Sequence, residues 1–338
     1  MKKLKVVQIG VGHDHATMTM ETMLKNPDVF EVAGYVVVPE DWRNVEFKGV
    51  HRFASVEEAL SVQGLDAAVI ESDEHVLTKY ALMAAKRGLH VQMDKPGGAD
   101  TEEFSELIRT VKEKNVAFNT GYMYRFNPAV KEIKRLIKSG ELGEIYSVET
   151  QMNVGYDETK RRWVKKFGNG GMLYFLGCHL IDLVYSIMGE PESIIPLTTG
   201  VYEDRDEIKD FGMVVYKYKN GVSFAKTTCC EQGGANRRQL VVCGTKGTCE
   251  LKPIELPSAG DGITCDLRTV IQKDNYKWWD AGTTVTYGPF HRYEEMLLYF
   301  AECARGERVN EFTPDYELKL HGFIMRSCAM KSPVTENI

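Results

Sequence analysis

The chain has 338 residues, more than the roughly 250–300 at which a single hydrophobic core stops growing, so two domains are expected. Its composition, 43% hydrophobic and 27% charged, excludes disordered, collagen-like and coiled-coil proteins. A net charge of -6 and a pI near 5.8 provide no broad basic field for a phosphate backbone, so no nucleic-acid partner is expected.

The first residues predict a cytoplasmic protein without a membrane partner. Two lysines precede an apolar stretch, but Gln8, His13 and Asp14 interrupt it well short of a signal-peptide core or a membrane span. The eight cysteines include no C-x-x-C pair, and the adjacent Cys229 and Cys230 would point to opposite faces of a strand. We therefore expect free thiols rather than a zinc ribbon or a disulfide framework.

Apolar runs alternate with helical stretches over the first third of the chain. The expected strands are residues 4–9, 31–38, 65–72, 89–94 and 116–122, and the clearest helices are 14–25, 76–88 and 101–114. This alternation is typical of a parallel sheet covered by helices. It predicts an α/β, doubly wound domain over residues 1–123.

The pattern changes at residue 124, where we place the start of a second domain, 124–338. An amphipathic helix from Pro128, an alternating strand from 144 and a helix from Gly171 to Met188 come first. Antiparallel signals follow, including a hairpin at Asn220-Gly221 that predicts a type I′ turn. We expect an α+β domain with an open, mostly antiparallel sheet. Its uncovered face predicts a homodimer or homotetramer.

The stretch VVQIGVGHDHA contains a shortened glycine motif. Gly10 would permit a tight turn, and Gly12 would let backbone amides approach a pyrophosphate at the start of a helix. His15 stands where a third glycine is usual, and Ala16 would take over the close helix–strand approach. A glycine turn in any α/β sheet could produce the same motif.

A metal site is the other interpretation of this stretch. His13 and His15 would need at least one more ligand, and Asp14 is the nearest in sequence, so a site would need distant help from a residue such as His179. We expect no metal, and place both histidines along a cofactor or substrate cleft.

Two further residues are candidates for chemistry. Lys95, between Asp94 and Pro96, follows an expected strand and would project into the crevice where open α/β sheets bind ligands, although a lysine in a loop is more often solvated. His179 shares a helix face with Phe175 and Asp182, but a single histidine on a helix is more often structural.

Together these motifs resemble the Gfo/Idh/MocA oxidoreductases, the glucose-fructose oxidoreductase and inositol dehydrogenase group. The resemblance covers nearly the whole chain, in this order: the glycine turn, Asp94-Lys95-Pro96, Tyr124 to Pro128, Trp163 before Gly170-Gly171, Gly177-x-His179-x-x-Asp182, and Gly244 to Thr248. It implies a Rossmann domain that binds NAD or NADP, an oligomerising second domain, and oxidation of a sugar, cyclitol or related polyol.

The resemblance also assigns roles to residues. Lys95 and His179 match the catalytic pair, with His179 taking the hydroxyl proton and Lys95 hydrogen-bonded to the reacting oxygen. The expected cofactor-binding residues are Gly10, Gly12, His13, Asp14, His15, Glu40, Ser72, Asp73, Lys95 and Pro96. The expected substrate-binding residues are Tyr124, Arg125, Tyr156, Trp163 and Asp182.

Three positions depart from the family pattern. Phe175 replaces an Asp one turn before the histidine, and Asp182 would have to substitute for it. The second strand ends in Val-Val-Val-Pro, with Glu40, Asp41 and Arg43 nearby, which leaves NAD against NADP open. His15 is the third departure. These features keep two alternatives to a dehydrogenase: a redox-neutral lyase or hydrolase that holds its NAD tightly, and a non-catalytic dinucleotide sensor.

Overall fold

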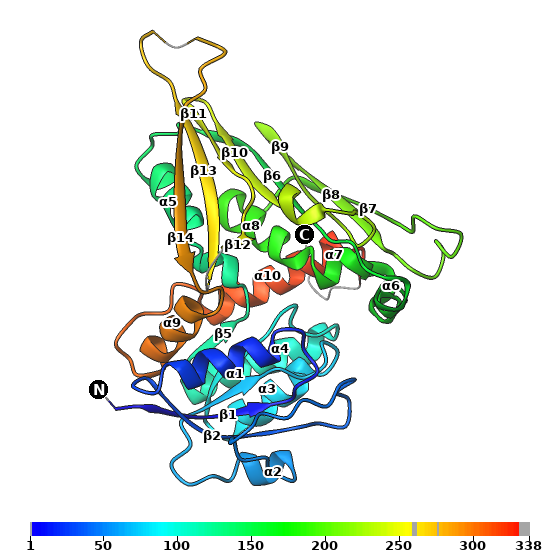
Figure 1. The fold of residues 1–338 in the computed structure, drawn as a ribbon, viewed down its shortest axis with the longest axis vertical. Helices are drawn as coiled ribbons and strands as arrows, with labels where there is room; N and C mark the ends of the chain where they lie inside the picture. Colours follow the sequence, from blue (N-terminus) through cyan, green and yellow to red (C-terminus); the bar gives the residue numbers. More distant parts are fainter. Residues whose placement is uncertain (1, 259–261, 276, 331–338) are drawn as a thin grey trace. The chain divides into compact units, whose positions relative to one another are not determined.

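The computed structural model describes residues 2–258, 262–275 and 277–330, which divide into two compact units (Figure 1). One unit comprises the chain up to Met123 together with Tyr293–Gly322, and the other comprises Tyr124–Arg292 and the described stretch that begins at Phe323. The predicted boundary after residue 123 coincides with this division. The predicted second domain, 124–338, differs from it, because Tyr293–Gly322 packs with the first unit.

The first unit contains a five-stranded parallel sheet in the order β2-β1-β3-β4-β5. Its strands are β1 Leu4–Ile9, β2 Phe30–Val36, β3 Ala67–Ile70, β4 His90–Met93 and β5 Phe118–Thr120. Its helices are α1 Ala16–Lys25, α2 Val56–Ala59, α3 Leu77–Lys86, α4 Thr101–Lys114 and α9 Glu294–Ala304. The strand order reverses direction between β1 and β3, which is where ligands bind in open α/β sheets.

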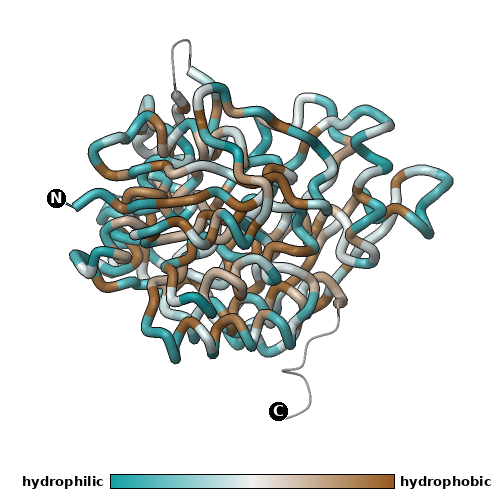
Figure 2. Tube along the Cα trace, turned by 90° about the horizontal axis from the view of Figure 1, so that it is seen from below, coloured by the Kyte–Doolittle hydropathy of each residue, from teal (hydrophilic) through white to brown (hydrophobic). Residues whose placement is uncertain are grey.

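The strands of this sheet are nearly all buried. β3 (AAVI) is apolar and buried throughout, as expected for a parallel strand covered on both faces. In Figure 2 the trace changes from hydrophilic colours near the N-terminus to hydrophobic colours along the buried strands. The helices contribute one apolar face each, and α4 begins at Asp100, whose side chain accepts hydrogen bonds from the amides of Glu102 and Glu103. The predicted α/β fold is confirmed.

The segment after Tyr293 completes the first unit. The side chain of Asn310 donates to the carbonyl oxygen of Phe118 on β5 at 2.7 Å. His321, on α10 (Pro314–Ser327), contacts the carbonyl oxygen of Gly98 at 3.0 Å and stacks on Phe104. Residues 293–322 thereby pack against β5, α4 and the loop that precedes α4.

The second unit contains a nine-stranded, mostly antiparallel sheet, which extends in Figure 1 from the orange and yellow strands β14 and β13 to the green strand β7. Its order is β12-β13-β11-β10-β6-β9-β8-β7, with β14 paired to β13 and only β6–β9 parallel among its described strands. The strands are β6 Ile145–Asn153, β7 Ser193–Thr199, β8 Phe211–Tyr218, β9 Gly221–Thr228, β10 Gln239–Gly244, β11 Gly247–Leu251, β12 Leu256–Pro257, β13 Ile263–Ile271 and β14 Thr283–Phe290. The predicted open sheet is confirmed.

Helices cover one face of this sheet, with α8 packed on β6 and β9 and α7 packed on β8. The α-helices are α5 Pro128–Lys138, α6 Glu158–Trp163, α7 Gly171–Phe175 and α8 Cys178–Met188, and short 3-10 helices span Met123–Phe126, Val164–Gly170 and Gly234–Arg237. No single helix of the described residues is long and apolar enough to cross a membrane, although the bent pair 158–175 and 178–188 passes by length and composition together.

Two local predictions for this unit are wrong. The helix expected from Gly171 to Met188 is interrupted, because the amide of Gly177 bonds to the carbonyl of Met172, five residues back, and α8 then starts anew. The hairpin turn is not type I′, since the residues between the paired Tyr218 and Gly221 are Lys219 and Asn220, and neither has a positive φ.

Candidate functional site

The glycine turn after β1 is shaped by close backbone approaches. Gly10 has φ +87°, and a Cβ atom there would lie 2.4 Å from the Cα of Ser72, which follows β3. A Cβ on Gly12 would lie 2.5 Å from a carboxylate oxygen of Asp41 and 2.8 Å from the amide nitrogen of Asp73. Gly10 therefore permits the contact between the two strand ends, and Gly12 permits an anion to reach the turn.

That anion is the carboxylate of Asp41. Its Oδ2 accepts hydrogen bonds from the amides of Val11 (2.8 Å) and Val38 (3.0 Å), and its Oδ1 accepts from the amide of Gly12 (2.9 Å). Burial raises the pKa of this carboxyl above its ordinary value, because desolvation outweighs the amides that favour the charged form. The turn is thus an anion-binding nest occupied by a side chain of the same unit.

The side chains of the two charged neighbours of Asp41 do not contact the turn amides. Glu40 accepts hydrogen bonds from Lys79 Nζ at 2.8 Å and Tyr80 OH at 2.6 Å, both on α3, so its carboxylate is held away from the glycine turn. Arg43 donates from Nε to the carbonyl of Val11 at 2.7 Å and from Nη2 to the carbonyl of His13. Of the predicted candidates at the end of β2, Asp41 is the one that meets the turn amides.

A cavity of about 510 Å³ lies beyond the end of β2. Its lining is mostly apolar and includes the last residue of β2, the residues that follow it, and side chains of α3. The lining residues are Val36, Val37, Val38, Pro39, Ala54, Ser55, Val56, Glu57, Lys79, Tyr80 and Met83. The cavity adjoins the anion nest through Val38, whose amide also donates to Asp41, and its lining of apolar and polar side chains can accommodate a planar ring.

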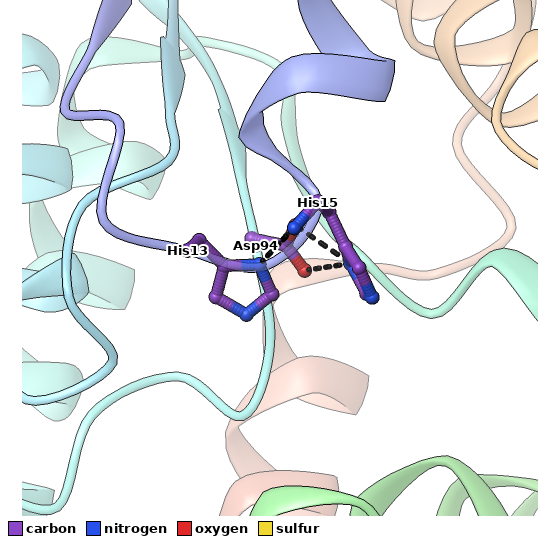
Figure 3. Close-up of side chains that lie close together, drawn as sticks. All are labelled: His13, His15 and Asp94. Atoms are coloured by element: carbon purple, nitrogen blue, oxygen red, sulfur yellow. Dashed lines mark hydrogen bonds and ion pairs between the residues drawn. The ribbon is translucent and has the colours of Figure 1, made fainter. Parts of the chain in front are cut away.

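The two histidines of the turn converge on Asp94, which follows β4 (Figure 3). Nδ1 of His13 and Nδ1 of His15 each lie 3.0 Å from Oδ2 of Asp94. His13 is fully buried, and its Nε2 lies 3.0 Å from the carbonyl oxygen of Lys95. Glu71, at the end of β3, places Oε2 3.8 Å from His13 Nδ1.

The electrostatics of this cluster follow from burial and mutual contact. Burial alone would raise the pKa of Asp94, but His13 and His15 outweigh it and hold that pKa well below the ordinary value. Burial and the neighbouring Asp94 charge raise the pKa of Glu71 well above its ordinary value. Burial lowers the pKa of His15 to about 4, against the pull of Asp94. Two carboxyls and two imidazoles therefore share a site largely closed to water.

The other predicted residues of this unit lie around the same sheet edge. Lys95 and Pro96 follow β4, and the Lys95 side chain is buried. Ser72 is buried after β3, and Asp73 Oδ1 accepts from the amide and Nδ1 of His75. Asp14 lies in the turn before α1. The first unit therefore brings every predicted cofactor-binding residue except Glu40 to the turn or the strand ends beside it.

In the second unit, Arg125 and Asp182 pair with each other. The guanidinium contacts Asp182 Oδ1 from Nη2 at 2.8 Å and from Nε at 3.0 Å, and both side chains are fully buried. His179, in the first turn of α8, lies edge-on to Tyr124 with ring centroids 5.3 Å apart. The hydroxyl of Tyr124 donates to Glu255 at 2.6 Å. Three predicted substrate residues thus surround the start of α8.

The remaining predicted substrate residues belong to an aromatic group. Trp163 lies edge-on to Phe175 at 4.8 Å, and Lys160 and Lys166 place their ammonium groups 4.2 and 4.0 Å from the indole centroid. Lys160 also lies 5.6 Å from the ring of Tyr156. Phe175, where the family pattern has Asp, packs into this apolar group rather than replacing a charge.

Two acidic residues of the cluster were missing from the predicted site. Asp94 was named only as part of the Asp94-Lys95-Pro96 motif, and Glu71 was not singled out. The signal for both was an acidic residue directly after an apolar strand of a parallel sheet, at the edge where ligands bind. No local pattern indicated that the turn histidines would face Asp94, because that contact joins residues about 80 positions apart.

Comparisons with known proteins give the family. Residues 4–122 match the model of an oxidoreductase family with an NAD-binding Rossmann fold, and residues 130–250 match the GFO/IDH/MocA C-terminal domain. The chain belongs to the Gfo/Idh/MocA oxidoreductase family. The expected resemblance is confirmed, and the anion nest after β1 lies in the dinucleotide-binding part of the fold.

Two curated relatives and one solved structure share between 17% and 30% sequence identity with this chain. A scyllo-inositol 2-dehydrogenase (NADP(+)) of Bacillus subtilis is 26% identical over 161 residues, 47% of this chain and 45% of the relative. A 2,7-anhydro-N-acetylneuraminate hydratase of Escherichia coli is 30% identical over 162 residues, 46% of this chain and 43% of the relative. The matches thus span about half the length of these relatives. A proposed NADPH-dependent oxidoreductase from Desulfitobacterium hafniense has the same fold, with a TM-score of 0.80 over 97% of this chain and 95% of that one, at 17% identity.

Proposed function

We propose that this chain is an NAD(P)-dependent oxidoreductase that oxidises a CH–OH group of a sugar, cyclitol or related polyol. The observation that carries the proposal is the anion nest, in which the amides of Val11 and Gly12 hold a carboxylate in the turn between β1 and α1. Family membership and the inositol dehydrogenase among the relatives support the substrate class.

The residues present fit a dinucleotide. Gly12 leaves room for an anion at the turn amides, and the apolar cavity beyond β2 suits the adenine ring. Because Asp41 already occupies these amides, a pyrophosphate must share or displace its carboxylate. When bound, the nicotinamide supplies the hydride acceptor.

The protein's own groups would handle the proton. We assign to His179 the removal of the hydroxyl proton as the hydride leaves the same carbon, so that the alcohol becomes a carbonyl group. We assign to Lys95 a hydrogen bond from its ammonium group to the reacting oxygen, which stabilises the negative charge that develops there. These two roles rest on the family pattern at residues 94–96 and 177–182.

The charges near the turn favour NAD over NADP. A 2′-phosphate beside the carboxylate of Asp41 would meet like charge, whereas a ribose 2′-hydroxyl could donate to it. Arg43, the nearest cation in sequence, is directed to the carbonyls of Val11 and His13. We therefore propose that the Asp41 carboxylate accepts a hydrogen bond from the ribose 2′-hydroxyl and thereby selects NAD.

Thermal unfolding with each dinucleotide tests the cofactor assignment. We expect NAD to raise the melting temperature more than NADP, and Asp41→Ala to reduce that preference. Glu40→Ala is the matched control, since its carboxylate is held by Lys79 and Tyr80. If neither dinucleotide stabilises the folded protein, the proposed function is rejected.

Turnover on a panel of sugars and polyols tests the chemistry. We expect Lys95→Ala and His179→Ala to abolish dinucleotide reduction while circular dichroism stays as in the wild type, and we expect His179→Ala to retain dinucleotide binding. Binding without turnover on any alcohol would indicate a dinucleotide sensor instead.

A redox-neutral reaction is the second candidate, because Phe175 removes a carboxylate beside the catalytic histidine and one relative is a hydratase. In that case the bound cofactor would be reduced and restored within one turnover. Mass spectrometry of products from glycoside substrates, with no net dinucleotide reduction, would identify this reaction.

We also propose a homodimer or homotetramer formed through the second-unit sheet. On the face opposite α8, apolar side chains of neighbouring strands lie in register, with Ile195 beside Val215 and Val215 beside Phe224. Ile195 and Leu197 on β7 are about half exposed. Sedimentation analysis should find an oligomer that Ile195→Asp dissociates, and a monomeric wild type would contradict this assembly.

A further inference from the structure

Three metal-ligand side chains meet at the carboxyl edge of the first sheet. His13 and His15 come from the turn before α1, and Asp94 follows β4 (Figure 3). One donor atom from each lies within 4.8 Å of the other two. No other group of His, Cys, Asp or Glu among residues 2–258, 262–275 and 277–330 has this arrangement. The third ligand is thus Asp94, not Asp14 or His179, which the sequence suggested.

The hydrogen bonds of His13 orient its ring for coordination. Nε2 lies 3.0 Å from the carbonyl oxygen of Lys95, which only accepts, so Nε2 carries the proton. The amide of His15 donates to Nδ1 of the same ring at 3.2 Å. In a neutral imidazole the lone pair on Nδ1 accepts from this amide, and Oδ2 of Asp94 lies 3.0 Å from the same nitrogen. Metal-binding histidines are typically fixed in this way, with the second ring nitrogen donating to a carbonyl or carboxylate.

The Asp94 carboxylate is also held in one orientation. Its Oδ1 accepts from the amide of Lys95 at 2.7 Å, which leaves Oδ2 facing the two imidazoles at 3.0 Å each. Gly121 makes room for this carboxylate, since a Cβ there would lie 2.4 Å from Oδ1. A carboxylate oxygen and the lone pair of His13 Nδ1 repel each other unless a positive species lies between them. That species is either a proton or a metal ion.

We propose that His13, His15 and Asp94 bind a divalent transition-metal ion, with Zn²⁺ the best match. Two imidazoles and one carboxylate suit zinc, whereas Mg²⁺ and Ca²⁺ require more oxygen ligands. With metal–ligand bonds of about 2.0–2.1 Å, tetrahedral ligand atoms lie roughly 3.4 Å apart. Asp94 Oδ2 lies 3.0 Å from each imidazole nitrogen, so these two pairs need to separate by only a few tenths of an ångström, and all three donor atoms already lie within 4.8 Å of one another. Glu71 Oε2 lies 3.8 Å from His13 Nδ1 and can supply the fourth ligand. This site does not depend on the proposed hydride transfer.

Titration of the metal-free full chain with Zn²⁺ and Co²⁺ tests the site. We expect one ion per chain, a Co²⁺ absorption spectrum without thiolate charge-transfer bands, and a higher melting temperature with Zn²⁺. His15→Gln and Asp94→Asn should weaken Zn²⁺ binding about 100-fold or more, since even changes outside the ligand shell cost 10–100-fold. The matched control is His75→Gln, because His75 contacts Asp73 at 3.0 Å in a pair with no second imidazole.

Several results would overturn the proposal. These are the absence of tight Zn²⁺ binding, thiolate bands that assign the ion to cysteines, or unchanged affinity in folded His15→Gln protein. His15 is the most exposed of the three ligands, so this variant is the least disruptive to folding. If Asp94→Asn fails to fold, the melting-temperature response of wild type against His15→Gln decides the question alone. A charged His13 in a protein that takes up no metal would assign the cluster to a proton.

Discussion

His321 makes the stability of the first unit depend on pH in a defined direction. Its side chain is 3% exposed, its Nε2 donates to the carbonyl of Gly98, and its ring stacks on Phe104 with centroids 4.1 Å apart. Burial lowers the pKa of the imidazole to about 4, because desolvation outweighs the Gly98 carbonyl and the Asp100 charge, which both raise it. The folded protein therefore holds His321 neutral at pH values where the unfolded chain protonates it.

The sign and size of the effect follow from this difference. The pKa is about 4 when folded and 6.5 when unfolded, so the unfolded state binds the extra proton between these values. The contribution of His321 is fully present above about pH 6.5 and is lost as the pH falls toward 4. A difference of about 2.5 pKa units corresponds to about 3 kcal/mol of unfolding free energy, of which about 2 kcal/mol is lost by pH 5.

Urea unfolding across this pH range measures the effect. His321→Gln keeps a donor for Gly98 but does not titrate, so its unfolding free energy should fall less steeply between about pH 6.5 and 5, by about 2 kcal/mol. His15, whose pKa is also lowered to about 4, is present in both proteins and cancels in the comparison. The same substitution at the exposed His51 is the control for replacing a histidine by glutamine. An unchanged slope in His321→Gln, or an NMR titration of the His321 ring near pH 6.5, would refute the reasoning.

Three further substitutions test packing and charge. Asp182→Asn removes the carboxylate that pairs with the buried Arg125 charge and should cost about 3–5 kcal/mol of unfolding free energy in urea unfolding. Replacing both residues by apolar ones should cost less than the sum of the two single changes. Gly10→Ala would place a Cβ 2.4 Å from the Ser72 backbone at a residue with positive φ. It should lower the unfolding free energy by at least about 1–3 kcal/mol, measured from the urea midpoint. A Gly10→Ala protein as stable as the wild type would show that this turn is looser than described. Asp100→Ala removes the N-cap of α4 and should lower the unfolding free energy by about 1 kcal/mol, with a null result indicating that the cap is dispensable.

The sequence predicted the parts of the fold that local patterns determine. Apolar runs such as residues 67–70 predict buried parallel strands because both faces of the sheet must be covered, and Gly10 predicts a turn because its φ is accessible mainly to glycine. The break at Gly177 was not predictable from the helical repeat, since it depends on an amide turning back to Met172. The return of Tyr293–Gly322 to the first unit depends on contacts such as Asn310 with Phe118, which local patterns do not encode.

The sequence predicted where the candidate site lies, but not which side chains pair with one another within it. The glycine turn and the ends of the parallel strands fixed where Lys95 and the histidines would lie. Which carboxylate meets which partner was decided by three-dimensional packing. Tyr80 and Lys79 draw Glu40 to α3, so Asp41 alone of the two reaches the turn amides. Periodicity and spacing do not report such competition between neighbouring acids.

The carboxyl edge of the first sheet holds several buried ionisable groups, and three of them have clear partners. Backbone amides donate to Asp41, two imidazoles contact Asp94, and the carbonyl of Lys95 contacts His13. A buried charge that lost its partner would cost several kcal/mol, so a ligand entering here must offer equivalent contacts. A pyrophosphate must therefore satisfy the amides that Asp41 now occupies, and a metal ion must replace a proton in the histidine cluster. Both proposed exchanges would replace one charge compensation by another, so we expect this edge to favour charged ligands over apolar ones.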